Sequence, residues 1–125
     1  MDFVVDPWEV KGDIDYNKLV ERFGLKPLSH LPEAFTKNLL FRRKKIFAHR
    51  DFKQIVDAVE QKKPFCMMTG LMPTGKLHIG HMIVAQQMIF YQSLGAKIYI
   101  AVADVEAYNA RRQSFEESRK IAIDQ

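Results

Sequence analysis

The chain of 125 residues contains a single cysteine, Cys66, and therefore cannot form an internal disulfide. A lone cysteine inside an apolar run is typical of proteins kept in a reducing compartment. The first six residues, Met-Asp-Phe-Val-Val-Asp, are acidic where a secretory signal would carry basic residues. We therefore expect a cytoplasmic protein without a targeting segment.

Charged residues are absent between Lys76 and Lys97. The uncharged run from Leu77 to Ala96 is long enough to be considered as a membrane span. It contains two histidines, three glutamines and a serine, however, and these side chains would be costly in lipid. We interpret the run as a helix and a loop of a globular protein, and we expect no membrane partner.

Acidic residues are scarce in the middle of the chain, although the composition as a whole is ordinary, with 47% hydrophobic and 27% charged residues. The net charge is +4, and residues 42–63 carry eight basic residues against three acidic ones. The basic segment 42–50 has two interpretations. It is either a solvated loop or a contact for the phosphates of a nucleotide or RNA.

Residues 1–63 are expected to form a mainly helical N-terminal extension. Its first residues predict a hairpin or an edge strand around Asp6-Pro7. One helix is predicted from Asp15, as its cap, to Phe23, and Gly24 ends it. A second short helix is predicted between a Ser29 cap and Leu40, and a third after Asp51 as its cap.

Residues 64–125 show a different pattern, which predicts an α/β fold. A strand over 65–69, a helix over 77–93 and a strand over 97–103 form a right-handed unit with parallel strands. We expect both strands and the helix to be largely buried. A polar connection over 108–113 and a helix capped by Ser114 follow. Because two parallel strands do not form a stable open sheet, we expect that these residues are one part of a larger protein or that the missing strands come from elsewhere.

The loop after the first strand resembles two phosphate-binding patterns. Gly70 to Leu77 nearly matches G-x-x-x-x-G-K-[ST], the phosphate-binding loop of nucleoside triphosphatases. Leu77 stands where that pattern needs a hydroxyl for magnesium, and Pro73 removes a backbone donor. This alternative is therefore disfavoured.

The second pattern is His78-Ile79-Gly80-His81, at the start of the helix. Residues three apart share a helix face, so both imidazoles can donate to the same phosphates. Lys76 and Thr74 can add donors, and Gly80 would let adenosine approach the backbone. A metal site is disfavoured because no cysteine or carboxylate lies nearby at ligand spacing. A histidine pair that only packs in the core is a further alternative.

Three blocks of sequence, in this order, resemble the class I aminoacyl-tRNA synthetases, and specifically the tryptophanyl enzymes of archaea and eukaryotes. They are D-F-V-V-D-P-W-E-V-x-G-x-I-D-Y, F-R-R-K-K-I-F-A-H-R-D, and T-G-L-M-P-T-G-K-L-H-I-G-H-M followed by A-D-V-E-A-Y. The resemblance spans nearly the whole chain. It implies that residues 64–125 are the first part of a Rossmann-like nucleotide-binding catalytic domain, with the rest of that domain and an anticodon-binding domain outside these residues.

The resemblance also implies the chemistry and the site. ATP with Mg²⁺, as a co-substrate rather than a tightly bound cofactor, would activate tryptophan for transfer to tRNA(Trp), in a homodimeric enzyme. The implied catalytic residues are His78, His81 and Lys76. The implied ATP-binding residues, besides the two histidines, are Gly70, Leu71, Met72, Pro73, Thr74, Gly75 and Gly80. The implied amino-acid-binding residues are Met68, Ala101, Asp104, Glu106 and Tyr108.

The sequence departs from the resembling family at two points. Many relatives have tyrosine at the position of Met68, and eukaryotic tryptophanyl enzymes have glutamine at that of Ala101. Archaeal tyrosyl enzymes tend to have A-D-L-H-A-Y where Glu106 stands here, which favours tryptophan. The K-M-S-K-S loop is absent, so these residues alone are expected to be inactive. A tyrosyl-tRNA synthetase and a non-catalytic nucleotide- or RNA-binding fragment stay as alternatives.

Overall fold

The computed structural model describes residues 4–5, 10–11 and 15–124. Contacts divide the chain into two compact units, Met1–Asp57 and Ala58–Gln125, so that the division falls inside a helix. The expected boundary lies slightly later, after residue 63. Asp6, Pro7 and Trp8 lie outside the described residues.

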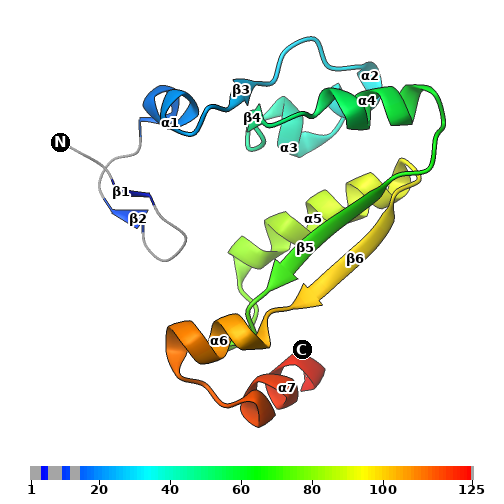
Figure 1. Ribbon diagram of the computed structural model, residues 1–125. Coiled ribbons are helices and arrows are strands. Elements are labelled where there is room, and N and C mark those ends of the chain that lie inside the picture. The colour runs from blue at the N-terminus through cyan, green and yellow to red at the C-terminus, as the bar shows by residue number, and fades with distance from the viewer. Residues whose placement is uncertain (1–3, 6–9, 12–14, 125) are drawn as a thin grey trace. The chain divides into compact units, whose positions relative to one another are not determined.

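The first unit combines short helices with two small antiparallel strand pairs (Figure 1). Its elements are β1 (Val4–Val5), β2 (Val10–Lys11), α1 (Tyr16–Arg22), β3 (Lys26–Pro27), α2 (Glu33–Thr36), α3 (Leu39–Arg42), β4 (Ala48–His49) and α4 (Lys53–Glu60). The pairs are β1 with β2 and β3 with β4. The antiparallel pairing of β1 with β2 agrees with the hairpin, one of the two predicted alternatives.

Helix α1 begins and ends as its sequence predicts. The Asp15 carboxylate accepts hydrogen bonds from the backbone N–H groups of Asn17 and Lys18, at 3.0 and 3.3 Å. These bonds satisfy donors that have no partner inside the helix. Gly24 follows the helix with a left-handed φ of 59°, which glycine adopts without strain.

The predicted single helix between Ser29 and Leu40 is wrong, because the chain forms two short helices there. Pro32 precedes α2 and provides no side-chain cap. Asn38 then caps α3, with its side-chain oxygen 2.9 Å from the backbone nitrogen of Leu40. An amide able to accept from a free backbone N–H favours the start of a new helix over continuation of the old one.

The predicted cap of α4 by Asp51 is also wrong. Asp51 has a left-handed φ of 58°, and the side chain that accepts from the first turn belongs to His49. Its Nδ1 lies 3.1 Å from the backbone nitrogen of Phe52.

Three phenylalanines form the centre of the first unit. Phe35 is fully buried, and its ring meets those of Phe41 and Phe52 edge to face, at centroid distances of 5.5 and 5.4 Å. Edge-to-face pairs align the positive ring edge with the negative ring face and add to the free energy gained by burial.

The second unit contains the predicted parallel unit. Its elements are β5 (Cys66–Leu71), α5 (Ile79–Ser93), β6 (Lys97–Val102), α6 (Asp104–Arg111) and α7 (Phe115–Asp124). Strands β5 and β6 pair in parallel, in register from Cys66 opposite Lys97 to Leu71 opposite Val102. Helix α5 runs along the two strands, and α6 and α7 follow the carboxyl end of β6 (Figure 1).

The prediction that both strands and α5 are largely buried is wrong for the described residues. Helix α5 packs against one face of the sheet, whereas Met68 on the other face is 73% exposed. On α5 itself only Met88 and Tyr91 are buried, and Ile79 is 76% exposed. Within the second unit, described by itself, these apolar side chains are not covered.

Burial has an electrostatic consequence at Tyr91. Loss of contact with water raises the pKa of the Tyr91 hydroxyl, and a hydrogen bond with Gln87 partly opposes this rise. The neutral phenol is therefore the form that this part of α5 accommodates.

The predicted polar connection over 108–113 is mostly helical, because α6 extends to Arg111. Asp104 and Glu106 lie in its first turn and Arg111 in its last, an arrangement that complements the helix dipole. The connection begins only at Arg112, which ends α6 with a left-handed φ of 57°. Among the described residues, no helix has the length and apolar character needed to cross a membrane.

Replacing Phe35 by alanine should lower the free energy of unfolding by about 3–5 kcal/mol, because it leaves a cavity between two rings. Chemical denaturation of the full-length protein measures the loss. Phe23→Ala, at a side chain that is 39% exposed, is the matched control and should cost less than about 2 kcal/mol. Equal losses in the two variants would contradict the assignment of this core.

Candidate active site

The loop over residues 72–77 follows the carboxyl end of β5, where parallel sheets bind ligands. The backbone N–H of Thr74 donates to the carbonyl of Met72, at 2.9 Å, and closes a three-residue turn around Pro73. Pro73 is buried, whereas Thr74, Gly75 and Lys76 are exposed. The loop therefore presents to solvent the residues that carry its predicted donors.

His78 and His81 cap helix α5 reciprocally. Nδ1 of His78 accepts from the backbone N–H of Gly80, and Nδ1 of His81 accepts from the backbone N–H of His78, each at 3.1 Å. The two ring centroids are 4.0 Å apart. The structure thus brings the two predicted catalytic histidines together and fixes both rings to the backbone.

These hydrogen bonds define the tautomer of each imidazole. An Nδ1 atom that accepts a hydrogen bond carries no proton, so in the neutral ring the proton is on Nε2. Each ring therefore has an Nε2–H donor on the side away from the backbone contact. Two imidazole donors at the N-terminus of a helix form a suitable surround for phosphate oxygens.

Gly80 has a role that the sequence did not reveal. A Cβ atom added there would lie 2.9 Å from Cε1 and 3.0 Å from Nδ1 of His78. The missing side chain leaves room for the His78 ring in its capping position. Close approach of adenosine, the reason expected from the sequence, stays a prediction.

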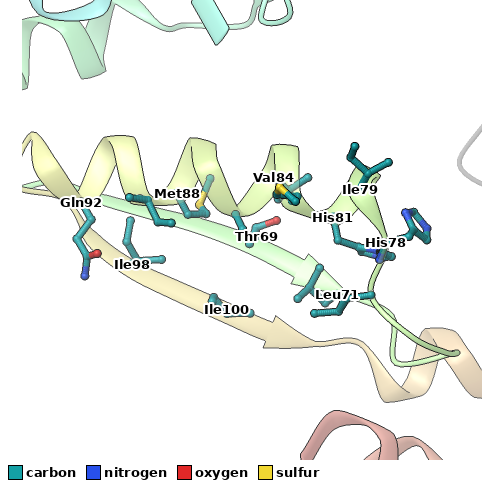
Figure 2. A pocket seen from close by; sticks show the side chains of 14 residues that line it. Thr69, Leu71, His78, Ile79, His81, Val84, Met88, Gln92, Ile98 and Ile100 are labelled. Atoms are coloured by element: carbon teal, nitrogen blue, oxygen red, sulfur yellow. Dashed lines mark hydrogen bonds between the residues drawn. The ribbon is translucent and has the colours of Figure 1, made fainter. Parts of the chain in front are cut away.

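An open groove of about 650 Å³ lies between α5 and the sheet face beneath it. Figure 2 shows His78 and His81 at one end and Gln92 at the other, with Ile98 and Ile100 of β6 along the floor. Apart from the histidines, Thr69 and Gln92, the groove is apolar. Two of its four polar side chains, those of His78 and His81, therefore lie at the end near the loop over residues 72–77.

The predicted amino-acid-binding residues lie in two places. Met68 and Ala101 share the uncovered face of the sheet, opposite to the face that carries Thr69. Gly70 is paired with Ala101 between the strands, so small residues leave a flat area beside Met68.

Asp104, Glu106 and Tyr108 lie on α6 instead. The Asp104 carboxylate accepts from the backbone N–H of Val105, at 2.8 Å, and Glu106 is exposed. The Tyr108 ring stacks on Phe115, at 5.2 Å, which directs it toward α7.

Gln113 is a residue near the loop that the sequence analysis missed. Its side-chain nitrogen donates to the carbonyl of Pro73 and to the hydroxyl of Ser118. No sequence signal links Gln113 with Pro73, which lies 40 positions earlier. The sequence predicts only that Gln113 belongs to a polar connection. Within the described part of the chain, no group of three or more metal-binding side chains occurs.

Replacing Gly80 by alanine should displace the His78 ring, because a Cβ cannot lie 2.9 Å from an imidazole carbon. We expect Nδ1 of His78 to lose its acceptor role, observed as a changed tautomer signal in nitrogen NMR of histidine-labelled protein without ATP. Gly75→Ala is the control, because a Cβ there meets nothing within 4 Å. An unchanged His78 signal in Gly80→Ala would contradict the steric role of Gly80.

Comparison with known proteins places the chain in a family. Residues 60–125 match the family described as class I tRNA synthetases (W and Y). The tryptophan–tRNA ligase of Archaeoglobus fulgidus is 43% identical over 120 residues, which are 95% of this chain and 29% of that protein. That of Methanocaldococcus jannaschii is also 43% identical, over 95% of this chain and 32% of that protein.

Solved structures agree. Tryptophanyl-tRNA synthetase from Aeropyrum pernix superposes with a TM-score of 0.74 and 39% identity, covering 86% of this chain and 31% of that one. The tryptophanyl-tRNA synthetase from Encephalitozoon cuniculi bound to tryptophan superposes with a TM-score of 0.79 and 28% identity. The match covers 90% of this chain and 34% of that one. The chain thus spans about a third of the length of these relatives, and the predicted Rossmann-like fold is confirmed. It belongs to the class I tRNA synthetases for tryptophan and tyrosine.

Proposed function

We propose that this chain provides the ATP-binding first part of a tryptophan–tRNA ligase. The reciprocal cap of His78 and His81 carries the proposal, because it turns two imidazole donors outward at the end of the phosphate loop. The relatives named above are tryptophan–tRNA ligases, which supports tryptophan rather than tyrosine as the amino acid. The full-length protein would act in the cytoplasm, as a homodimer, on tryptophan, ATP and tRNA(Trp).

The reaction requires stabilisation of charge on phosphate. The tryptophan carboxylate attacks the α-phosphorus of ATP, a carboxyl–phosphate bond forms, and the bond to the β-phosphate oxygen breaks as pyrophosphate leaves. Mg²⁺ accompanies ATP as part of the substrate. Negative charge grows on the oxygens during this step, so donors fixed in advance at those positions lower the barrier. Nε2–H of His78 and His81 would supply such donors.

The exposed loop residues would complete the ATP site. Lys76 forms no ion pair with a described carboxylate, so its ammonium can interact with the charge of the departing pyrophosphate. Thr74 adds a hydroxyl. The other ATP-binding residues, Gly70, Leu71, Met72, Pro73, Gly75 and Gly80, would line the path by backbone contact.

Tryptophan would lie over the carboxyl end of the sheet. Met68 is 73% exposed and can contact an indole through its sulfur. Ala101 and Gly70 leave space for a flat ring beside it. Glu106 would hold the ammonium, with Asp104 and Tyr108 close by on the same helix. Neither Met68 nor Ala101 has a side chain that is a strong acceptor for the indole N–H, so another residue would have to provide one.

The first unit offers a second function, in binding RNA. Arg42, Arg43, Lys44 and Lys45 are consecutive and exposed. Arg50 instead donates to the carbonyl of Phe23, at 2.7 Å. We propose that residues 42–45 contact tRNA phosphates. Affinity for tRNA that does not change between low and high salt would contradict this role.

Replacing His81 by alanine in the full-length protein should lower tryptophan-dependent ATP–pyrophosphate exchange at least tenfold. This corresponds to ~1.4 kcal/mol or more of lost transition-state stabilisation. His30→Ala is the control, because His30 is exposed and lies in the first unit. Unchanged exchange in His81→Ala would end the proposed role of this residue.

Replacing Glu106 by glutamine should raise the KM for tryptophan about tenfold and leave the KM for ATP unchanged, because a charge-assisted hydrogen bond to the ammonium is lost. Glu116→Gln, an exposed carboxylate on α7, is the matched control. The same assay with tyrosine in place of tryptophan separates the two substrates. Exchange that depends on tyrosine alone would replace the proposed function with that of a tyrosyl enzyme.

A further inference from the structure

The conformation of the phosphate loop depends on a contact from outside the strand–loop–helix unit. The turn around Pro73 leaves the carbonyl of Pro73 directed toward the connection between α6 and α7. There it accepts a hydrogen bond from Nε2 of Gln113, at 2.5 Å. Pro73 is buried, so this carbonyl needs a protein donor.

The orientation of the Gln113 amide follows from its partners. A carbonyl oxygen can only accept, so the atom facing Pro73 has to be the amide nitrogen. The same nitrogen lies 2.8 Å from the hydroxyl of Ser118, which is fully buried. Both hydrogens of the amide group are thus used, one for the loop and one for α7.

The position of Gln113 is itself fixed by α6 and α7. Its backbone N–H donates to the carbonyl of Ala107, a fully buried residue, and Arg112 before it adopts the left-handed conformation that ends α6. Tyr108 and Phe115 stack between the two helices. A side chain held from both ends in this way can hold a neighbouring loop in place.

We propose that Gln113 is a positioning residue for ATP binding, which fixes the loop over 72–77 relative to α6. This inference rests on the proposed function, since α6 also carries Glu106, Asp104 and Tyr108. Gln113 contacts the loop backbone and not the substrate. Its effect is to hold Thr74 and Lys76 in the geometry in which they meet phosphate, so that less ordering is needed when ATP binds.

Gln113→Glu is the sharpest variant, because it keeps the shape and replaces the donor by an acceptor. The new carboxylate oxygen would face the carbonyl of Pro73, and two acceptors repel. The hydroxyl of Ser118 can rotate to donate to the carboxylate, so the contact with α7 survives. Gln113→Met removes the donor without adding charge. Gln86→Glu, at an exposed position on α5, is the control for the change in charge.

Kinetics in the full-length protein give the first test. We expect Gln113→Glu to raise the KM for ATP at least tenfold in ATP–pyrophosphate exchange, and the KM for tryptophan less than twofold. Gln113→Met should change the KM for ATP in the same direction, and Gln86→Glu should match the parent protein. An unchanged KM for ATP, or an equal rise for both substrates, would overturn the proposal.

Hydrogen–deuterium exchange of the backbone amides of residues 74–77 gives a second test that needs no activity. We expect faster hydrogen–deuterium exchange at these amides in both Gln113 variants, with the exchange of the α5 amides close to that of the parent. If the parent protein shows no ATP–pyrophosphate exchange with tryptophan or tyrosine, the proposed function fails. Hydrogen–deuterium exchange still decides in that case whether Gln113 holds the loop. Unchanged hydrogen–deuterium exchange of the amides of residues 74–77 would refute the role of Gln113 in holding the loop.

Discussion

The reciprocal hydrogen bonds between His78 and His81 are the constraint on which the site depends. They lie at the start of α5, where they satisfy backbone donors and orient both rings. One pair of contacts thus has a structural and a chemical consequence. The atoms used to build the helix end are the Nδ1 atoms, and the Nε2 atoms take no part in the cap. A cap made by serine or aspartate would build the same helix end without providing such donors.

The loop between β5 and α5 is held from both of its ends by different means. At one end Ala103 donates to the carbonyl of Leu71 and extends the pairing of the strands, and at the other the histidine cap fixes residue 78. Between them, the contact of Gln113 with Pro73 joins the loop to the helices that follow β6. The three elements that surround the carboxyl end of the sheet therefore share one hydrogen-bonded framework, in which the exposed Thr74 and Lys76 are carried by a fixed backbone.

The sequence predicted local structure well where a residue acts on its neighbours. The Asp15 cap, the strand–helix–strand order and the histidine pair all depend on spacings of two to four residues, which are visible in the chain. It failed at Asn38, where a cap starts a new helix in place of one continuous helix, and at Asp51, where His49 rather than the aspartate accepts the backbone N–H. It also failed for contacts across the fold, such as that of Gln113 with Pro73. The family resemblance extended the prediction to the chemistry, but the steric reason for Gly80 needed coordinates.

The space beside His78 has a consequence for how substitutions combine. A Cβ at position 80 would meet the imidazole at position 78. Loss of that imidazole would therefore remove the obstacle, and the two substitutions together should perturb the backbone less than the sum of their separate effects. The steric need for glycine at position 80 thus depends on the histidine at position 78. The steric constraint runs one way: a side chain at position 80 meets the imidazole at position 78, whereas glycine at position 80 puts no obstacle in the way of a change at position 78.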